Sequence, residues 1–362
     1  MRSITSIPDL VKRATRDAGF DLSGIAPVHD FHELAYFPAW IDAGHAGEMK
    51  YLEARDDAGQ LKRSSLRVAV PWARSVIVCA INYNTEQPYS TELNDPQRGW
   101  ISRYAWGRED YHDSVLKRLR AVEKQLTEAV ASDHPTGRSS DALPRTWCYV
   151  DTGPIVERVY AKYAGVGWIG KNTCVLNQKL GSWLFLGVIL TSLELTPDLP
   201  APDRCGTCTR CLEACPTDAF LGPYQLDANK CISYLTIEKR GVIPEELRDG
   251  VGRQVFGCDI CQDVCPWNRK APASQAAEFQ SRENLVNPAL EWLAEMTPEN
   301  FRETFRGSPV RRTKLSGLKR NAAIAMGNSG DRKFLPTLEK LIDDEDAVVA
   351  ESAQWALQRL RS

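Results

Sequence analysis

Eight cysteines between residues 205 and 265 are the residues of this chain best suited to do chemistry. The first four have the spacing C-x2-C-x2-C-x3-C-P, the bacterial pattern that holds cubane iron–sulfur clusters. In that pattern the first three thiolates bind one cluster, and the fourth, which precedes proline, binds the other. The spacing therefore predicts two [4Fe-4S] clusters and the transfer of single electrons.

The same rule assigns each thiol to a cluster. A regular second run would carry a cysteine at position 255, but Val255 stands there, and Cys231 is the spare cysteine of the segment. Eight thiolates then complete two cubanes with none left over. We expect one cluster on Cys205, Cys208, Cys211 and Cys265, and the other on Cys215, Cys231, Cys258 and Cys261.

Two other uses of these cysteines fit the pattern less well. Disulfides suit small secreted domains, and this chain has 362 residues with no recognisable signal peptide. Zinc favours two separated C-x2-C pairs, not a triple run that ends in Cys-Pro.

Composition limits the class of protein. Hydrophobic residues make up 43% of the chain and charged residues 25%, as in an ordinary soluble protein. The net charge of −2 gives no argument for nucleic-acid binding, so only local basic patches can. The longest apolar stretch, residues 183–190, is too short to cross a bilayer. Oxygen-sensitive clusters and three further cysteines fit a reducing cytoplasm, and we expect no membrane association.

Helices and strands alternate over the first half of the chain. The patterns predict helices over 7–18, 31–55 and 113–131 and one starting at Pro154, with strands over 20–28, 75–83, 145–150 and 183–191. A loop rich in Gly, Ser and Pro covers 134–144. These elements predict an N-terminal α/β domain over 1–195, within an α+β chain.

The rest of the chain divides in two. A proline-rich segment leads into a ferredoxin-like domain, which we place at 196–285. Residues 301–320 then carry seven basic side chains against one acid, Glu303. A weak repeat follows, because Leu318 and Ala322 recur 31 residues later as Val349 and Ala353. Short paired helices at that period predict a HEAT-like domain over 286–362.

Electrons from the clusters need an acceptor, and the sequence excludes the common ones. No G-x-G-x-x-G opens a helix after a strand, so a Rossmann nicotinamide or flavin site is unsupported. The pattern D-x-H-x-x-G, through which histidine ligates a corrinoid, is also missing, because residues 110–115 read DYHDSV. Asp151 stands where a strand meets a helix. From position alone, an N-cap role is the favoured interpretation of Asp151.

Several long motifs in one order resemble a known family. They are VDTGP at 150–154, GVGWIGKN at 165–172, GSWLFLG at 181–187, the first cysteine run, CISYLTIE at 231–238 and GCDICQDVCPWN at 257–268. In this combination the chain resembles epoxyqueuosine reductases from about Gly47 to the C-terminal repeat.

The resemblance implies a function and its cofactors. The family reduces epoxyqueuosine to queuosine at the wobble position of tRNA, the final step of queuosine biosynthesis. It uses base-off cobalamin in a low-valent state, two [4Fe-4S] clusters, and electrons from an external donor, which we expect to be flavodoxin- or ferredoxin-like. Asp151 matches the family's proton donor, and a buried carboxyl with a raised pKa can play that role at neutral pH.

The resemblance also suggests contact residues. For cobalamin the candidates are Lys171, Asn172, Cys174, Ser182, Trp183, Ser233 and Tyr234. Family members often carry asparagine where this chain has Cys174. For tRNA the candidates are the basic residues ahead of the repeat, whose alternative role is a solvated charged face: Arg311, Arg312, Lys314, Lys319 and Arg320.

Three other functions compete with this one. A corrinoid-dependent reductive dehalogenase also pairs two such clusters with a base-off corrinoid, although a basic solenoid would have no purpose there. A pure electron carrier would bind no corrinoid, and a structural tRNA-binding protein would hold redox-silent clusters. We expect a monomer, but the sequence fixes neither the oligomeric state nor the electron donor.

Overall fold

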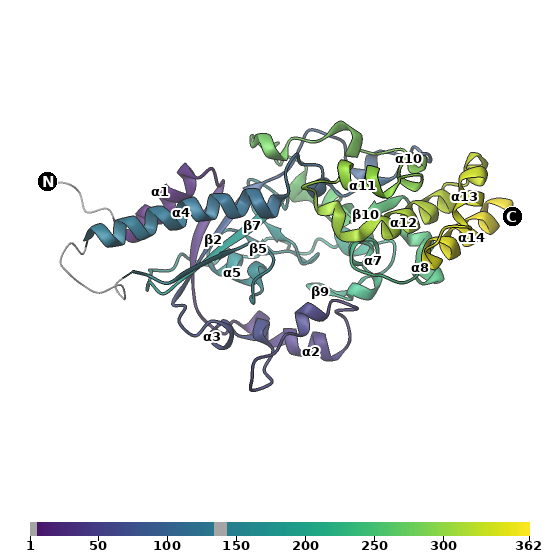
Figure 1. The fold of residues 1–362 in the computed structure, drawn as a ribbon. Helices are drawn as coiled ribbons and strands as arrows, with labels where there is room; N and C mark the ends of the chain where they lie inside the picture. The colour runs from purple at the N-terminus through teal and green to yellow at the C-terminus, as the bar shows by residue number, and fades with distance from the viewer. Residues whose placement is uncertain (1–5, 134–142) are drawn as a thin grey trace.

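The computed structural model describes residues 6–133 and 143–362 (Figure 1). A sheet-containing part lies at one end of an elongated molecule and a group of helices at the other. The mixture of helices and strands confirms an α+β chain. Most of the predicted loop over 134–144 lies outside the described residues.

One antiparallel sheet organises the first part of the chain. Its strand order is β1-β2-β7-β4, and every pairing is antiparallel. The prediction placed all four strands to within a few residues, because each is an apolar run bounded by turns. The strands are β1 (Leu22–Pro27), β2 (Ser75–Asn82), β4 (Thr146–Tyr149) and β7 (Leu184–Thr191).

Helices cover both faces of this sheet, which is why all eight residues of β2 are buried. On one face, α1 (Ile7–Asp17) and α4 (Tyr111–Asp133) pack through Val11, Val115 and Leu119. On the other face, α5 (Glu157–Tyr163) packs beside Phe31, and α2 (Tyr36–Asp42) and α3 (Leu66–Ala69) lie further along (Figure 1).

The cysteine segment is built from short elements. Helix α6 contacts α9; α6 carries Cys211 of the first cysteine run and α9 carries Cys261 of the second. Strand β10 pairs in parallel with β3, so a strand of the predicted first domain joins the predicted second one. The elements are β3 (Trp100–Ile101), β5 (Trp168–Ile169), β6 (Val175–Leu176), α6 (Arg210–Glu213), β8 (Phe220–Gly222), β9 (Gln225–Leu226), α7 (Ile232–Ile237), α8 (Glu245–Val251), β10 (Gln254–Phe256) and α9 (Ile260–Asp263).

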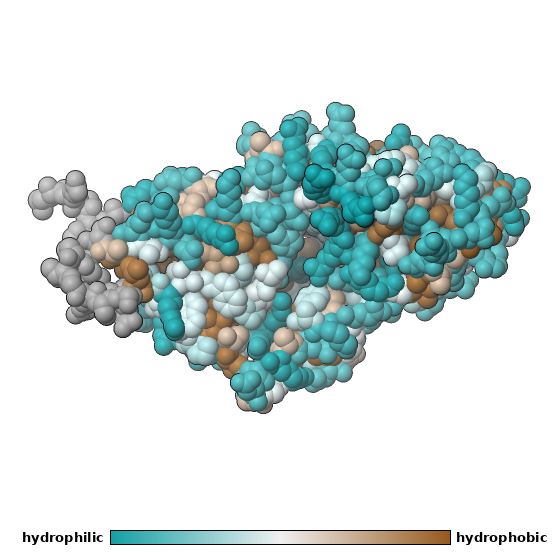
Figure 2. Space-filling model, viewed as in Figure 1, coloured by the Kyte–Doolittle hydropathy of each residue, from teal (hydrophilic) through white to brown (hydrophobic). Residues whose placement is uncertain are grey.

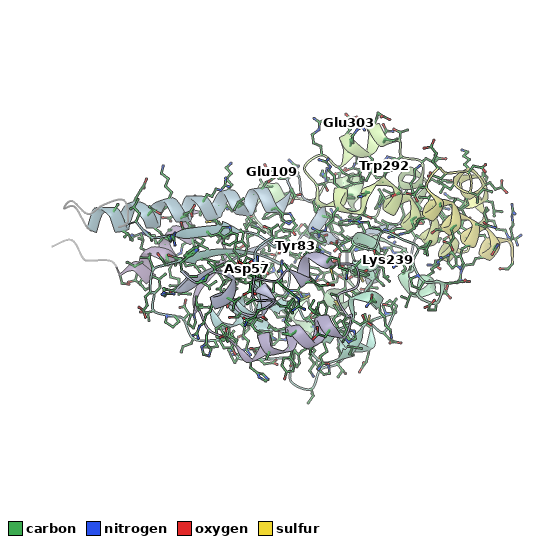
Figure 3. The ribbon with its side chains drawn as sticks, turned by 60° about the horizontal axis from the view of Figure 1, so that its bottom comes forward. Asp57, Tyr83, Glu109, Lys239, Trp292 and Glu303 are labelled. Atoms are coloured by element: carbon green, nitrogen blue, oxygen red, sulfur yellow. The ribbon has the colours of Figure 1, made fainter. Side chains whose placement is uncertain are left out.

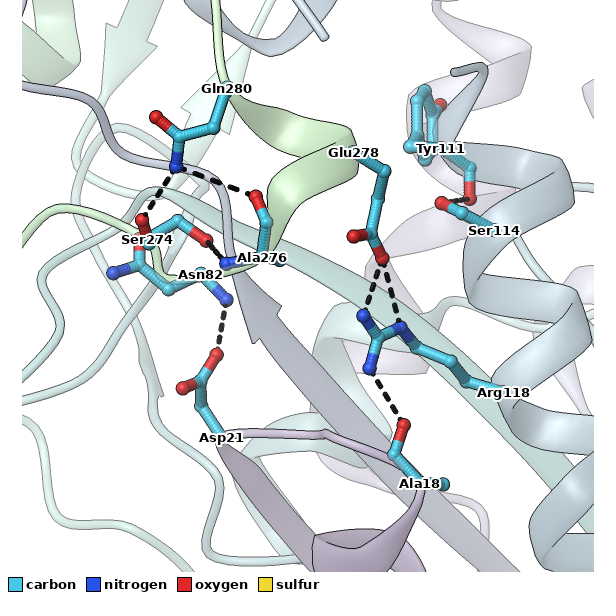
Figure 4. Close-up of polar contacts among 10 residues, drawn as sticks. All are labelled: Ala18, Asp21, Asn82, Tyr111, Ser114, Arg118, Ser274, Ala276, Glu278 and Gln280. Atoms are coloured by element: carbon cyan, nitrogen blue, oxygen red, sulfur yellow. Dashed lines mark hydrogen bonds and ion pairs between the residues drawn. The ribbon is translucent and has the colours of Figure 1, made fainter. Parts of the chain in front are cut away.

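The stretch after the last cluster cysteine is fastened to the first part by polar contacts (Figure 4). Arg118 on α4 forms an ion pair with Glu278 and donates to the backbone oxygen of Ala18 at 2.7 Å. On the sheet, the backbone N–H of Asn82 donates to Asp21 at 2.7 Å. The ion pair with Glu278 ties the stretch after the last cluster cysteine to α4, and the other two contacts join α4 to the end of α1 and β2 to the residue before β1.

Five helices form the C-terminal part: α10 (Leu290–Ala294), α11 (Pro298–Thr304), α12 (Lys314–Ser329), α13 (Leu335–Leu341) and α14 (Ala347–Arg361). Both halves of the weak repeat are buried where α12 packs on α14. A side chain at Gly327 would come within 2.9 Å of Ala356, so glycine permits this close approach. The assignment to HEAT-like repeats remains a prediction.

The face shown in Figure 2 is mostly hydrophilic and is recessed where the sheet-containing part meets the C-terminal helices. Within the described ranges, we find no helix with both the length and the apolar character required to span a membrane.

Candidate active site and cluster-binding thiols

The first group of thiols contains the four cysteines assigned to one cluster. The thiol of Cys211 lies within electrostatic range of Cys205 and Cys208, and the thiol of Cys265 lies within range of Cys211 and Cys205. Burial raises the pKa of Cys211 and of Cys265 to about 11, and the neighbouring thiols add to this rise. The buried indole N–H of Trp168 has no partner among the residues that the structure describes, and the ring packs in the same apolar cluster as Cys205 and Cys265. Iron would favour the thiolates, and the indole could donate to a cluster sulfur, so these residues fit a cluster.

The second group contains the other four cysteines. Cys258 lies within electrostatic range of Cys231 and Cys215, and Cys261 within range of Cys258 and Cys231. The backbone N–H of Ala219 donates to the sulfur of Cys215 at 3.4 Å. Burial raises the pKa of Cys258 well above its usual range, so a positive partner is needed for it to ionise.

The thiols do not form a compact single-ion site. Among residues 6–133 and 143–362, no three His, Cys, Asp or Glu side chains lie close enough to hold one metal ion. The spacing of the cysteines in the sequence and the electrostatic proximity of the sulfurs within each group favour cluster binding. The division into two sets of four stays a prediction.

Asp151 lies just after β4 and has a φ of +57°, a left-handed conformation that is unusual for a residue with a side chain. The hydroxyl of Tyr111, at the start of α4, donates to its Oδ2. The Nε2 of His112 lies 3.8 Å from the same oxygen, and the Nδ1 of His112 lies 2.7 Å from Asp110. Strained backbone of this kind is concentrated at functional sites.

The electrostatics around Asp151 suit proton transfer. Burial opposes the charged form of His112, but the hydrogen bond to Asp110 and the charges of Asp110 and Asp151 together outweigh it and raise the pKa of His112. Burial and the nearby Asp151 raise the pKa of Tyr111 well above its usual range, which keeps its hydroxyl a donor. Asp151 therefore sits between a neutral phenol and an imidazole that holds its proton more firmly than usual.

Two expectations about Asp151 need correction. It does not cap a helix, because α5 begins at Glu157 and its N-cap residue is Val156. Nor is it buried, because 53% of its side chain is exposed. The buried carboxyl of this site is Glu157: burial, followed by the effect of Asp151, raises the pKa of Glu157 to about 7. Sequence reasoning missed Glu157, since nothing in the helical pattern distinguishes it from a surface residue.

Several predicted cobalamin contacts instead join the sheet to the cysteine loops. Lys171 Nζ donates to the carbonyls of Gly206 at 2.7 Å and Cys208 at 2.9 Å. Asn172 Nδ2 donates to the carbonyl of Cys261 at 3.3 Å. These two side chains therefore position the cluster loops.

Two more of the predicted contacts are interior residues. Trp183 has no exposed surface, and Ser182 bonds Gln262 at 2.8 Å. The prediction that the Trp183 side chain touches a cofactor is wrong, because its indole is enclosed by protein.

The remaining predicted contacts lie beside the second thiol group. Cys174 interacts with Cys261, which lowers the pKa of Cys174 to about 7. Ser233 and Tyr234 follow Cys231, and their backbone N–H groups donate to its sulfur. The Tyr234 hydroxyl accepts a hydrogen bond from the backbone N–H of residue 48 at 2.7 Å.

The predicted tRNA contacts also divide. Arg311 and Lys314 are exposed, and Lys314 has a φ of +61°. Lys319 is paired with an acid, Asp344, at 2.9 Å. Arg320 is fully buried and donates to three backbone carbonyls, those of Leu235, Lys239 and Gly241. The prediction that Arg320 contacts tRNA is therefore wrong, because its guanidinium holds the protein interior together.

Arg312 occupies an unexpected place near Asp151. Its guanidinium pairs with Glu238 and lies over the ring of Tyr51, 5.4 Å from the ring centroid. The charges of Arg312 and Asp151 both act on the hydroxyl of Tyr104. A basic residue of the C-terminal part thus reaches the candidate active site.

Comparisons with known proteins agree with this arrangement. The family model described as a 4Fe-4S double cluster binding domain matches residues 204–268. A second, described as "Epoxyqueuosine reductase QueG, DUF1730", matches residues 63–152. An epoxyqueuosine reductase of Pseudomonas aeruginosa is 40% identical over 355 residues, covering 96% of this chain and 93% of the relative. One of Synechocystis sp. is 44% identical over 304 residues, covering 83% and 98%.

Solved structures give the same result. An epoxyqueuosine reductase crystallised with a tyrosine tRNA stem loop that carries epoxyqueuosine matches with a TM-score of 0.84 and 29% identity, covering 98% of this chain and 90% of that one. The enzyme of Streptococcus thermophilus matches with a TM-score of 0.82 and 28% identity, covering 97% and 89%. With whole-chain relatives at this level of identity, the chain belongs to the epoxyqueuosine reductase family.

Proposed function

We propose that this chain reduces epoxyqueuosine in tRNA to queuosine, with two [4Fe-4S] clusters and cobalamin as cofactors. The observation that carries the proposal is the setting of Asp151, a residue with strained backbone whose carboxyl accepts a hydrogen bond from Tyr111 and lies 3.8 Å from His112. The spacing of the eight cysteines supports it. Family membership supplies the substrate.

The reaction removes an epoxide oxygen as water and leaves an alkene, so it consumes two electrons and two protons. Cobalamin, when bound, would supply a strongly nucleophilic low-valent cobalt. The oxygen released from carbon needs a proton within hydrogen-bond reach, and we assign that donation to Asp151. Tyr111 fixes the Asp151 carboxyl through its hydrogen bond, and His112 can return a proton to it.

Two buried polar atoms near Asp151 have no hydrogen-bond partner within the described residues. They are the hydroxyl of Tyr149, which ends β4, and Oε1 of Glu157, on which the charge of Asp151 acts. Protein atoms cover both of them, as they cover the indole of Trp183, so neither is assigned a contact with the cofactor. We propose that Ser233 and the backbone of the glycine-rich turn hold cobalamin.

We assign the remaining roles by region. Residues 1–195 would bind cobalamin and perform the reaction, 196–285 would hold the clusters, and the helices of 286–362, taken as a HEAT-like domain, would hold tRNA. Electrons would come from a flavodoxin- or ferredoxin-like carrier. Arg311 and Lys314 remain the candidates for phosphate contacts, because both are exposed.

The test is anaerobic reconstitution with cobalamin, a strong reductant and tRNA that carries epoxyqueuosine, followed by nucleoside analysis. The wild-type chain should form queuosine. Asp151→Asn should keep its iron and its corrinoid spectrum but turn over about 100-fold more slowly or worse, since general acids contribute at least that much. Full activity in this variant would remove Asp151 from the mechanism, and no queuosine from the wild type would overturn the function.

A further inference from the structure

Three segments far apart in the sequence meet beside Asp151 and form one exposed surface. Tyr51, on the 3-10 turn Lys50–Glu53, is 48% exposed. The guanidinium of Arg312 lies 5.4 Å from the centre of its ring and is itself 48% exposed. The largely buried carboxylate of Glu238 fixes that guanidinium by an ion pair. We name Tyr51, Arg312 and Glu238 the Tyr51 platform.

Further contacts hold the platform rigid. Glu48 pairs with Lys239 at 3.0 Å and accepts from the backbone N–H of Arg240 at 3.1 Å, which joins the first segment to the second. Arg240 donates to the carbonyl of Arg312 at 2.9 Å, which joins the second to the third. Thr313 Oγ1 donates to the carbonyl of Thr236 at 2.8 Å. Figure 3 shows Lys239 near the middle of the molecule, where these segments converge.

An aromatic ring paired with a guanidinium plane is how proteins hold unstacked bases of RNA. The platform also lies beside the proposed proton donor, because the charge of Asp151 acts on Tyr51 and that of Arg312 acts on His112. The reacting ring of epoxyqueuosine hangs from its base on a short arm. A base that brings this ring to Asp151 must therefore lie within a few side-chain lengths of the carboxyl.

We infer that the Tyr51 platform is a nucleobase-binding site that holds the wobble base of the tRNA by stacking on Tyr51 and Arg312. This inference rests on the proposed function and deepens it. Arg312 then has a different task from its neighbour Arg311, which is exposed and suited to a phosphate. Arg312 needs its planar guanidinium to lie over the ring of Tyr51, whereas a phosphate contact needs only a positive charge.

The experiment measures binding to cobalamin-free protein, so it does not depend on turnover. The probes are two synthetic anticodon stem loops, one with guanine at the wobble position and one abasic there. Wild type should bind the abasic loop about tenfold more weakly, because stacking of one base is worth that much. Tyr51→Ala should bind the guanine loop with about tenfold lower affinity than wild type. Its affinity for the abasic loop should equal that of wild type. Tyr51→Phe keeps the ring and should match wild type.

A pair of matched variants separates stacking from charge. Arg312→Lys keeps the charge but loses the planar group, so it should weaken binding of the guanine loop several-fold. Arg311→Lys, one residue away, should bind as wild type does. Equal losses by Tyr51→Ala on both stem loops would overturn the inference, and so would unchanged binding in both Tyr51→Ala and Arg312→Lys. Failure of turnover with this binding pattern intact would count against the proposed function alone.

Discussion

Replacing Glu157 by glutamine should remove a pH-dependent cost from the folded protein. The carboxyl is enclosed, and its Oε1 makes no hydrogen bond within the described residues. Burial and the charge of Asp151 raise the pKa of Glu157 from 4.5 to about 7, while Arg63 and Arg158 oppose the rise. In the unfolded chain the carboxyl of Glu157 ionises near its ordinary pKa, whereas in the folded chain it keeps its proton up to a higher pH.

The sign and size follow from these two pKa values. Below pH 4.5 the group is protonated in both states and has no effect. Between pH 4.5 and 7 the unfolded state gives up the proton first, so the free energy of unfolding falls as pH rises. Above pH 7 the loss is constant. A shift of this size amounts to about 3 kcal/mol, at 1.36 kcal/mol for each pH unit.

The assay is urea denaturation of cobalamin-free protein under anaerobic conditions at several pH values from 4.5 to 8. Glu157→Gln should match wild type at pH 4.5 and be more stable by up to about 3 kcal/mol at pH 8. Glu303→Gln, at the exposed position labelled in Figure 3, is the control and should follow wild type throughout. A Glu157→Gln variant whose difference from wild type is the same at every pH would refute the reasoning.

Three other perturbations test separate parts of the structure. Cys211→Ala and Cys231→Ala should each lose about four irons per chain. Each variant should lose a different one of the two cluster signals in electron paramagnetic resonance, and loss of the same signal by both would contradict the assignment of the thiols. Arg320→Ala should destabilise the protein by roughly 3 kcal/mol, because it removes the donor of three carbonyls, one of them buried and two partly buried. Urea denaturation checks this loss, and filter binding should show an unchanged salt dependence of tRNA binding. Replacing Arg311 and Lys314 together by alanine should make the negative slope of log affinity against log salt shallower by about 1.5. An unchanged slope would place the phosphate contacts elsewhere.

The assignment of the cysteines to two clusters depends on short-range spacing and stays a prediction. Three thiols two residues apart fit one cluster, and the cysteine before proline turns away. Only Cys231 had to be assigned as the one cysteine left over, since its predicted partners are distant in the chain. The strands were predictable for a similar reason: a run such as β2 is apolar along its whole length, and both its faces are covered.

The basic residues show where such prediction stops. Arg311, Arg312 and Arg320 look alike in the sequence, but one is exposed, one stacks on a tyrosine, and one is fully buried. What separates them is the packing of α12 against the loop after α7, which depends on residues about 80 positions away. Tyr51 escaped notice for the same reason, since its neighbours come from two other parts of the chain.

The position of the site explains why one chain contains all three parts. Asp151 follows strand β4 of the sheet, and Arg312 precedes the helix that packs the C-terminal part together. Glu238 follows α7, whose N-cap residue is the predicted cluster ligand Cys231. Arg320 ties α12 to the loop after α7 through its three carbonyl contacts, so Arg312 cannot shift without moving the segment beside the second thiol group. An RNA loop bound by the C-terminal helices would therefore meet the proton donor and the cluster segment in a fixed geometry. Separating the parts would leave each with its own contacts but without a shared site, because the Tyr51 platform exists only where they meet.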